Sequence, residues 1–460
     1  MIFTMDGAMK IFIIGCGAVA QCTIPLIFKN TGLKPKDIKM IDPVDNRTRI
    51  QEFLDQGMQY EMIAISPENY IQILKQNVNP GDICIDLANK VDTISILSWC
   101  HENNVRYLNT CLNKWKHEKV VPIRELYESV LQLSSRWNNN GPTSILSHGA
   151  NPGLISSFTK QALVDMAAHT LKAKKDLNAR AELEKALAEN NFQQLARLQN
   201  IQVIHVAEKD TQQIEYKKKP NQFLSTWSVI EFSEECKSKA EFAWGTHEKS
   251  IPAKSEIKDS DLLMQLKAMH LKVQSWLPNE SFHGIVPPHD EVFMIADYLS
   301  IKDGPIYSYR PTILFAYQPA EFAQESLHEF EKRNFILPDE QHVIHKGIVN
   351  GSDTMGALLL SPQGGWWTGS SLSIQEANSL IAGHNATVMQ VAAGALAALI
   401  FMIDHPQSGI YMPEELDHQK ILKNAQSYLG DFISTPCPWN PAEAKKDLTF
   451  EHFIAQPPRK

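Results

Sequence analysis

Short apolar runs recur along the first third of the chain and alternate with segments of helical spacing. The apolar runs cover residues 10–14, 38–42, 60–66, 82–87, 105–109 and 144–148. Between them lie segments such as PENYIQILKQNV and VPIRELYESVLQLSSRW, whose apolar residues recur every three or four positions. Strands that alternate with helices predict a mostly parallel sheet covered on both faces, with right-handed crossovers. We therefore expect an α/β domain over residues 1–152.

The first predicted strand runs directly into the turn GCGAVA. Gly-x-Gly-x-x-Ala between a strand and a helix is typical of a Rossmann-type dinucleotide-binding domain, although such glycines also form turns without a ligand. Asp42 ends the second predicted strand, where its carboxylate would accept hydrogen bonds from a ribose and repel a 2′-phosphate. The combination favours NAD over NADP. The expected contacts in this region are Gly15, Gly17, Ala18, Val19, Ala20 and Asp42.

Further cofactor contacts are expected where the later strands end, because ligands bind at the carboxyl edge of such sheets. These candidates are Asn89, Asn109, Thr110, Cys111, Asn151 and Pro152. The last two belong to SHGANPG, which either forms a simple turn or directs Asn151 and the following helix toward the nicotinamide. Pro25 falls inside the first predicted helix, which it should kink or shorten.

The pattern changes after Leu154. Residues 160–200 predict amphipathic, solvated helices. Strands are predicted at 201–211, 223–232, 241–247, 310–317, 342–349 and 355–361, and the second and third could pair across an SEEC turn. We expect an α+β substrate domain over 153–384, and C-terminal helices over 385–460 that return to the first domain and contribute dimer contacts. The apolar run 391–403 is too short to span a bilayer, so it predicts a buried helix.

Composition narrows the class of protein. The formal net charge is -8, which disfavours nucleic acid as a partner and is compatible with a cationic substrate. The seven cysteines show no paired metal-ligand spacing, so we expect a reduced, cytoplasmic protein without a metal site. We identify no secretory segment and expect no membrane partner.

Several polar residues stand out in the predicted second domain. Glu208 ends one predicted strand, and Trp227 precedes Glu231, Glu234 and Glu235. In a strand, Trp227 and Glu231 would share one face. His289, Asp290 and Glu291 follow two prolines. Each has an ordinary structural interpretation, since a Glu at a strand end is usually solvated and a Trp in a strand usually belongs to the core.

The widely spread stretches HGANPG, AEKDTQ, TWSVIEF, HDEVFMIADY and WWTGSSLSIQEA resemble the bacterial homospermidine synthases, in the saccharopine-dehydrogenase-like group. The resemblance implies that bound NAD⁺ oxidises putrescine to an imine and that ammonia leaves. A second putrescine then forms a new imine, and the stored hydride returns to give homospermidine. It also implies a homodimer.

The resemblance further implies roles for individual residues. Trp227 is the aromatic wall, Glu208 and Glu235 hold amino groups, His289 and Glu291 line the pocket, and Asn151 lies near the nicotinamide. An aromatic face attracts an ammonium without taking its proton. A carboxylate or a histidine would transfer protons at each imine step, and the sequence does not decide which.

One stretch departs from the family pattern of an acid followed by Pro and Trp. Here Asn113 and Lys114 precede Trp115, which would weaken diamine binding unless Lys114 points away. We therefore also consider Asn113 and Asp92 as substrate contacts, with Asp92 supplying part of the missing charge.

Two other functions remain open at this point. A net dehydrogenase acting on an amino acid or a carboxylated polyamine would require cationic side chains for the carboxylate, and Arg310 is the obvious candidate. A non-catalytic NAD-binding sensor would not depend on Trp227 or Glu208.

Overall fold

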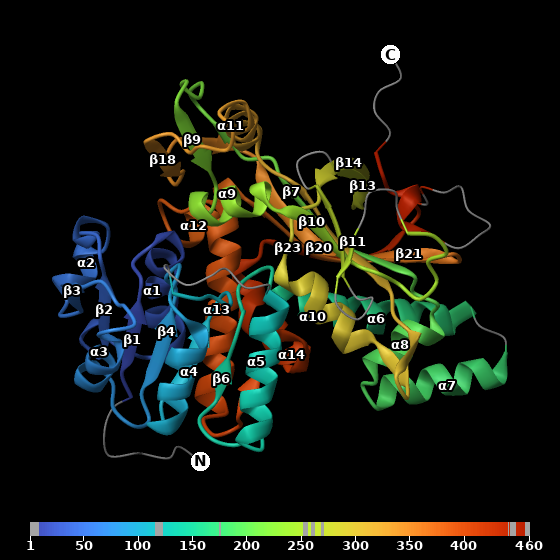
Figure 1. Ribbon diagram of the computed structural model, residues 1–460, viewed down its shortest axis with the longest axis horizontal. Helices are drawn as coiled ribbons and strands as arrows, with labels where there is room; N and C mark the ends of the chain where they lie inside the picture. Colours follow the sequence, from blue (N-terminus) through green and yellow to red (C-terminus); the bar gives the residue numbers. More distant parts are fainter. Residues whose placement is uncertain are drawn as a thin grey trace. The chain divides into compact units, whose positions relative to one another are not determined.

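The computed structural model describes residues 9–115, 123–173, 176–251, 256–258, 263–267, 271–439, 441 and 448–455. Contacts within the chain divide it into two compact units, and Figure 1 labels many of their elements. Unit 1 consists of Met1–Leu154 and Val388–Tyr428, and unit 2 consists of Ile155–Thr387 and Leu429–Lys460. The chain therefore passes between the units three times.

Unit 1 contains a parallel sheet with the order β22-β6-β5-β4-β1-β2-β3. Its strands are β1 (Ile11–Ile14), β2 (Ile38–Asp42), β3 (Gln59–Met62), β4 (Ile83–Asp86), β5 (Arg106–Asn109), β6 (Ser144–Ile145) and β22 (Ile410–Tyr411). The six predicted strands are thus confirmed, and so is the Rossmann-type fold. The edge strand β22 was missed because it is only two residues long and lies far away in the sequence.

Helices accompany this sheet. They are α1 (Ala18–Thr31), α2 (Gln51–Leu54), α3 (Tyr70–Asn77), α4 (Thr93–Glu102), α5 (Ile123–Arg136), α13 (Ala386–Asp404) and α14 (His418–Ala425). Pro25 does not shorten α1, which continues to Thr31 and ends at Gly32 in the left-handed conformation. The predicted buried helix is α13. It is long and apolar enough to cross a membrane, but 83% of its most apolar window is buried in the protein, as in the core helix of a soluble domain.

Unit 2 is built on a mixed sheet. Its main path has the order β11-β12-β10-β17-β7-β20-β21-β23, and the hairpin β13–β14 joins it through β17. The strands are β7 (Val203–Asp210), β10 (Lys239–Ala243), β11 (Glu256–Lys258), β12 (Leu263–Lys267), β13 (Lys272–Leu277), β14 (Glu280–Ile285), β17 (Thr312–Gln318), β20 (Ser352–Ser361), β21 (Gly364–Ser373) and β23 (Asp431–Cys437). The central strands β7 and β17 run parallel, whereas β20 is antiparallel to β7.

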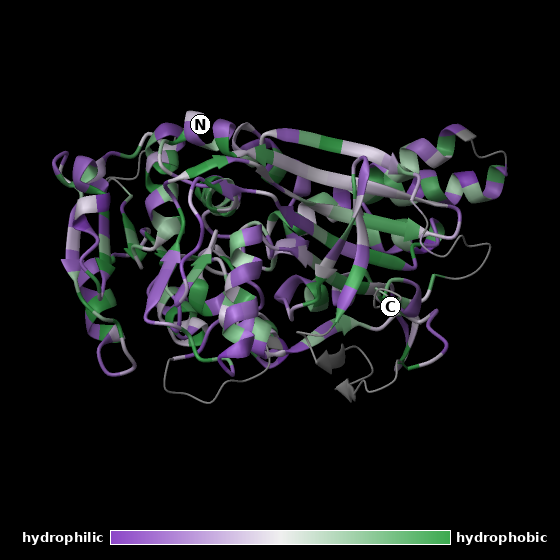
Figure 2. Cartoon of the chain, turned by 90° about the horizontal axis from the view of Figure 1, so that it is seen from above, coloured by the Kyte–Doolittle hydropathy of each residue, from purple (hydrophilic) through white to green (hydrophobic). Residues whose placement is uncertain are grey.

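One hydrophobic cluster of unit 2 packs against this sheet, whose central strands β7 and β17 are buried on both faces. There the rings of Phe242 and Phe450 stack with their centroids 4.0 Å apart, close to the fully buried Trp367. The amphipathic helices predicted at 160–200 are α6 (Leu154–Ala173), α7 (Leu177–Ala188) and α8 (Phe192–Leu198). They carry hydrophilic and hydrophobic residues side by side (Figure 2). Packing of their apolar side against the unit leaves the charged side in water.

The strand predicted at 223–232 is wrong in its second half. Strand β9 (Gln222–Ser225) ends before Trp227, and helix α9 (Val229–Lys237) follows. The Ser228 hydroxyl accepts a hydrogen bond from the Glu231 amide and so starts the helix. The glutamates predicted to form a turn therefore lie on α9. Strand β9 pairs with β18 (Glu340–Val343), not with β10.

The remaining elements are short. The strand predicted at 342–349 is divided into β18 and β19 (Ile348–Asn350), and β19 pairs with β8 (Gln213–Ile214). The others are α10 (Asp290–Leu299), β15 (Ile301–Asp303), β16 (Ile306–Tyr309), α11 (Glu321–Lys332) and α12 (Ile374–Leu380).

Candidate functional site

The turn after β1 contains two glycines with different surroundings. The backbone requires glycine at Gly15, and Gly17 has open space beside it. Gly15 has a φ of +96°, and a Cβ there would lie 2.9 Å from the Leu87 carbonyl carbon, so the turn requires glycine. A Cβ at Gly17 would meet no atom within 4 Å. Gly17 also caps α1, whose first turn carries no acidic residue. The amides of Ala18, Val19 and Ala20 thus begin a helix that suits a pyrophosphate.

Asp42 is held in place at the end of β2. One carboxylate oxygen accepts the Cys16 amide at 2.7 Å, and the other accepts the Val44 amide at 2.7 Å. The oxygen that accepts the Val44 amide also accepts the Asn46 side-chain amide at 3.5 Å, and the oxygen that accepts the Cys16 amide keeps a second lone pair, which a ribose hydroxyl could use. Together with the glycine turn, this arrangement fits a dinucleotide.

The cofactor contacts predicted at the ends of β4 and β5 differ in how exposed their side chains are. Asn109 is buried, and its side chain accepts the Ser147 amide at 2.8 Å and donates to the Thr93 hydroxyl at 3.2 Å. It therefore joins β5 to β6 and α4. Asn89 is exposed, whereas Thr110 and Cys111 are half-buried.

The HGANPG segment is a tightly packed turn. A Cβ at Gly153, where φ is +127°, would lie 2.3 Å from the Gly149 carbonyl oxygen. A Cβ at Gly394 of α13 would lie 2.0 Å from the same oxygen. Burial lowers the pKa of His148 to about 4, so the ring is neutral at pH 7 and meets the Gly394 carbonyl oxygen at 3.1 Å. Asn151 is half-buried, and a cis peptide bond joins it to the buried Pro152.

Lys114, which with Asn113 departs from the family pattern before Trp115, forms an ion pair within unit 1. Its ammonium lies 2.9 Å from a carboxylate oxygen of Asp92. The other Asp92 oxygen accepts the Ser95 amide at 2.7 Å and caps α4. The Asn113 amide donates to Thr93, and its side-chain amide donates to the Cys111 sulfur at 2.9 Å. Lys114 therefore pairs with Asp92 inside unit 1, and this pairing reduces the negative charge that Asp92 offers to a substrate.

Unit 2 gathers acidic residues on its central strands. Glu208 and Asp210 lie on β7, and Asp353 lies opposite Asp210 on β20. All three are buried, so Glu208 is not solvated as a glutamate at a strand end usually is. Burial, reinforced by Glu208 and Asp210, raises the pKa of Asp353 well above its usual range. Burial also raises the pKa of Asp210 to about 6, although hydrogen bonds from Gln212 and Thr226 oppose it.

Aromatic rings lie beside these acids. The Trp227 indole donates to the Tyr317 hydroxyl at 3.0 Å, and Tyr317 lies opposite Glu208 in the sheet. The Tyr317 ring stacks on Phe315 at 5.4 Å, and the His289 ring lies 4.8 Å from Phe315. Trp227 itself is half-buried. It is therefore neither a strand residue nor an enclosed core residue.

His289 connects two further carboxylates. One ring nitrogen bonds to Glu291, and the other lies 3.7 Å from Glu235. Burial disfavours the charged imidazole, but the carboxylates of Glu291 and Glu235 outweigh it and raise the pKa of His289 to about 10. Burial raises the pKa of Glu235 to about 8 despite the nearby His289. One oxygen each of Glu235 and Glu291 is buried without a hydrogen-bond partner among the described residues.

Helix α9 separates the three glutamates that follow Trp227. Glu235 is one helical turn after Glu231, so these two share a face. Glu234 points elsewhere, is largely exposed and pairs with Lys237 at 3.1 Å. The strand alternation that placed Glu231 on the face of Trp227 therefore does not apply.

The sequence analysis missed Asp210, Asp353 and Tyr317. A signal existed for Asp210, because Glu208 and Asp210 alternate within an otherwise apolar strand and must share one face. Asp353 precedes the apolar run by which β20 was predicted. Within the described ranges, no group of three or more His, Cys, Asp or Glu could hold a metal ion.

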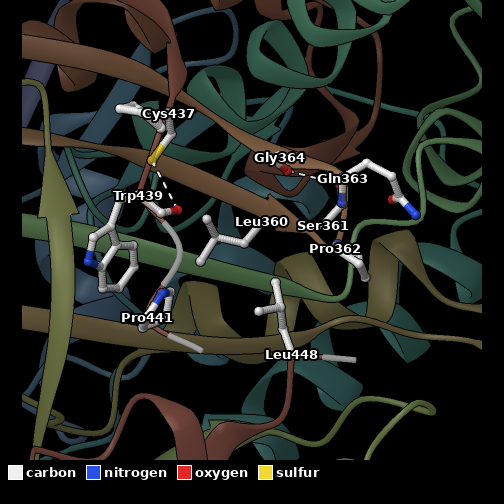
Figure 3. Close-up of a pocket in the computed structure, with 10 residues that line it drawn as sticks. Leu360, Ser361, Pro362, Gln363, Gly364, Cys437, Trp439, Pro441 and Leu448 are labelled. Carbon is white, nitrogen blue, oxygen red and sulfur yellow. Dashed lines mark hydrogen bonds between the residues drawn. The ribbon is translucent and has the colours of Figure 1, made fainter. Parts of the chain in front are cut away.

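A cavity of about 350 Å³ opens elsewhere in unit 2 (Figure 3). It lies where β20 turns into β21 and where β23 ends, and Leu360, Gln363, Cys437 and Trp439 are among the residues that line it. None of the predicted site residues lines this cavity.

The chain belongs to the saccharopine dehydrogenase family. Residues 11–145 match the saccharopine dehydrogenase NADP binding domain, and residues 149–431 match the saccharopine dehydrogenase C-terminal domain.

Within this family, the resemblance to homospermidine synthases is confirmed. The chain is 30% identical to a homospermidine synthase of Blastochloris viridis, over 99% of this chain and 96% of that relative. It is 27% identical to a homospermidine synthase of Mesorhizobium japonicum, over 95% and 92% of the two chains. The crystal structure of the homospermidine synthase of Legionella pneumophila in complex with NAD superimposes with a TM-score of 0.88. That chain is 30% identical, and 98% of each chain is covered.

Proposed function

We propose that the protein is a homospermidine synthase, which condenses two putrescine molecules to homospermidine with release of ammonia. The observation that carries the proposal is the cluster in unit 2, where the buried Glu208 lies opposite Tyr317 in the sheet and Tyr317 accepts a hydrogen bond from the Trp227 indole. A diammonium ion that leaves water requires such carboxylates and gains from an aromatic face. The names of the similar proteins support the same reaction.

Unit 1 would hold the cofactor, NAD. Bound NAD⁺ supplies the acceptor, and later the donor, of a hydride. Its pyrophosphate would lie against Gly17 and the first amides of α1, and its ribose would bind Asp42. Further proposed contacts are Asn89, Thr110, Cys111, Asn151 and Pro152. Asn109, whose side chain is used within the fold, would support this edge indirectly.

The residues of unit 2 would bind the amine and move protons. Glu208 and Glu235 would bind ammonium groups, and Trp227 would form the aromatic wall. Ammonia leaves only after its nitrogen is protonated. Burial lowers the pKa of the His289 ring, but the Glu291 and Glu235 carboxylates outweigh burial and raise this pKa to about 10, so the ring carries a proton at pH 7 and suits this donation. Glu291, which bonds to this ring, would balance its charge.

A dehydrogenase acting on a carboxylated substrate is less well supported. Arg310 is buried, its guanidinium donates to the Trp244 carbonyl oxygen, and it lies 4.3 Å from the centre of the Tyr307 ring. It also precedes β17, at the opposite end of that strand from Tyr317. It therefore serves the fold, not a substrate carboxylate.

We further propose that the protein works in the cytoplasm as a homodimer. The cysteine pattern supports the compartment, and the family resemblance supports the dimer.

The test incubates the protein with putrescine and substoichiometric NAD⁺, and measures homospermidine, ammonia and NADH. We expect many equivalents of homospermidine and ammonia per NAD⁺, with no accumulated NADH. Stoichiometric NADH would instead indicate a net dehydrogenase, and no turnover would contradict the proposal.

The same assay tests the aromatic wall. Trp227→Ala should lower kcat/KM for putrescine at least tenfold and leave the Kd of NAD⁺ unchanged, because a desolvated cation–π contact contributes about 2 kcal/mol or more. Trp227→Phe, which keeps an aromatic face, should lose less. Equal activity of the alanine variant and the native protein would refute the assignment.

A further inference from the structure

The residue before Trp227 is anchored on two sides. Thr226 is buried, and its hydroxyl donates to the Asp210 carboxylate at 2.7 Å. Its carbonyl oxygen accepts the side-chain amide of Asn385 at 2.7 Å. The same amide nitrogen of Asn385 donates to the Ile344 carbonyl oxygen at 2.7 Å. Both the side chain and the backbone of Thr226 are therefore fixed by residues distant in sequence.

Asp210 is itself held rigidly. Its other carboxylate oxygen accepts the Gln212 amide at 2.9 Å and the Gln212 side chain at 3.1 Å. Gln212 also donates to the Thr387 hydroxyl at 3.1 Å and accepts the Ala386 amide at 2.9 Å. These groups are buried, so each must find its partner within the fold. The network leaves Thr226 little freedom.

Trp227 lies between β9 and α9 and belongs to neither. No strand or helix therefore fixes its backbone, and the hydrogen bonds of Thr226 do so instead. Its indole is half-buried, and it contacts Phe232 at 5.1 Å between ring centroids and Tyr317 through one hydrogen bond. A rotation of the backbone at Thr226 would turn the indole away from Tyr317. Because a cation is attracted only over the face of a ring, such a rotation would weaken the attraction for an ammonium.

We propose that Asp210, acting through the Thr226 hydroxyl, is a positioning residue that fixes the Trp227 indole for amine binding. The role in amine binding rests on the proposed function. The orientation of the ring by Thr226 does not, and it can be measured without any substrate.

The test replaces Thr226 by valine, which has nearly the same shape but no hydroxyl. Thr226→Val should lower kcat/KM for putrescine at least tenfold, chiefly through KM, and leave the Kd of NAD⁺ unchanged. Thr226→Ser, which keeps the hydroxyl, should restore most of the activity. Thr368→Val is the matched control, because Thr368 is a buried threonine of the same unit and its hydroxyl bonds to Ser434 at 2.8 Å. The control should keep the native KM.

A double-mutant cycle with Trp227→Ala, which removes the aromatic face, tests whether the effect passes through the ring at this position. Thr226→Val should change kcat/KM less than twofold in the Trp227→Ala background. An equal loss in both backgrounds, or no loss in either, would overturn the proposal. If Thr226→Val does not fold, Thr226→Ala, which leaves room for a water molecule at Asp210, is carried through the same cycle.

Fluorescence separates this proposal from the proposed function. The emission of Trp227 is obtained by subtracting the spectrum of the Trp227→Phe protein, in the native and in the Thr226→Val background. We expect the two difference spectra to differ in emission maximum and in quenching by acrylamide. Identical difference spectra would overturn the positioning role, whatever the substrate. A changed spectrum in a protein inactive on putrescine would contradict only the proposed reaction.

Discussion

At the scale of single residues, Gly15 and Gly17 belong to the same turn but have different roles. The backbone requires glycine at Gly15, because its φ is +96° and the Leu87 carbonyl leaves no room for a side chain. Gly17 has open space before it and no such conformational need. The sequence pattern that revealed both glycines could not separate these roles, because Leu87 approaches Gly15 only in the folded sheet.

We predict opposite effects for alanine at the two positions. Gly17→Ala should unfold at nearly the native temperature but bind NAD⁺ at least tenfold more weakly, since the methyl group occupies the space for the pyrophosphate. Gly15→Ala should lose about 1–3 kcal/mol of folding stability. Thermal unfolding and isothermal titration with NAD⁺ measure the two effects. Unchanged NAD⁺ affinity in Gly17→Ala would argue against a pyrophosphate at this turn.

Glu235 leads to a prediction about protons. Burial raises its pKa to about 8, so the carboxyl is protonated at pH 7. A bound ammonium favours the carboxylate and lowers this pKa, so binding of putrescine should release protons at pH 7. Titration calorimetry in two buffers of different ionisation enthalpy measures the release.

Matched variants test the source of the protons. Glu235→Gln should reduce the release without abolishing it, because burial also raises the pKa of Asp290 to about 7. Glu234→Gln, on the exposed side of the same helix, should leave it unchanged. Proton uptake in the native protein, or the same release in both variants, would contradict the prediction.

At the scale of elements, the sequence predicts the strands of unit 1 well and fails at α9. Buried parallel strands are continuous apolar runs between helices, so little else fits their pattern. Around Trp227 the β-branched and aromatic residues favour a strand by local preference. The Ser-x-x-Glu signature from Ser228 to Glu231 indicates a helix start, and the structure has the helix, not the strand, from Val229 on. The contacts of Thr226 with Asp210 and Asn385 have no local signature, so no periodicity could predict them.

The cap of α9 can be tested directly. Ser228→Ala removes the side-chain oxygen that accepts the Glu231 amide, and it should cost about 1 kcal/mol in urea unfolding. Ser228→Asp retains an acceptor and should lose little. If α9 depends on its packing alone, the two variants will have the same stability.

At the scale of the whole molecule, cofactor and amine residues are assigned to different units. Hydrogen exchange can follow each ligand separately. NAD⁺ should slow exchange in residues 15–21 of unit 1, and putrescine should slow it in residues 226–237 of unit 2. The reverse pattern would contradict the division of roles.

The discontinuity of unit 1 has a consequence for biosynthesis. Strand β6 pairs on its outer side with β22, and Gly149 is covered by Gly394, but both partners follow the whole of Ile155–Thr387 in the chain. At about 5–20 residues per second, the ribosome needs roughly 10–50 s to reach them. During this time the nascent nucleotide-binding unit exposes an unpaired strand edge and an uncovered glycine turn. This is the stage at which a chaperone would be most useful to the chain.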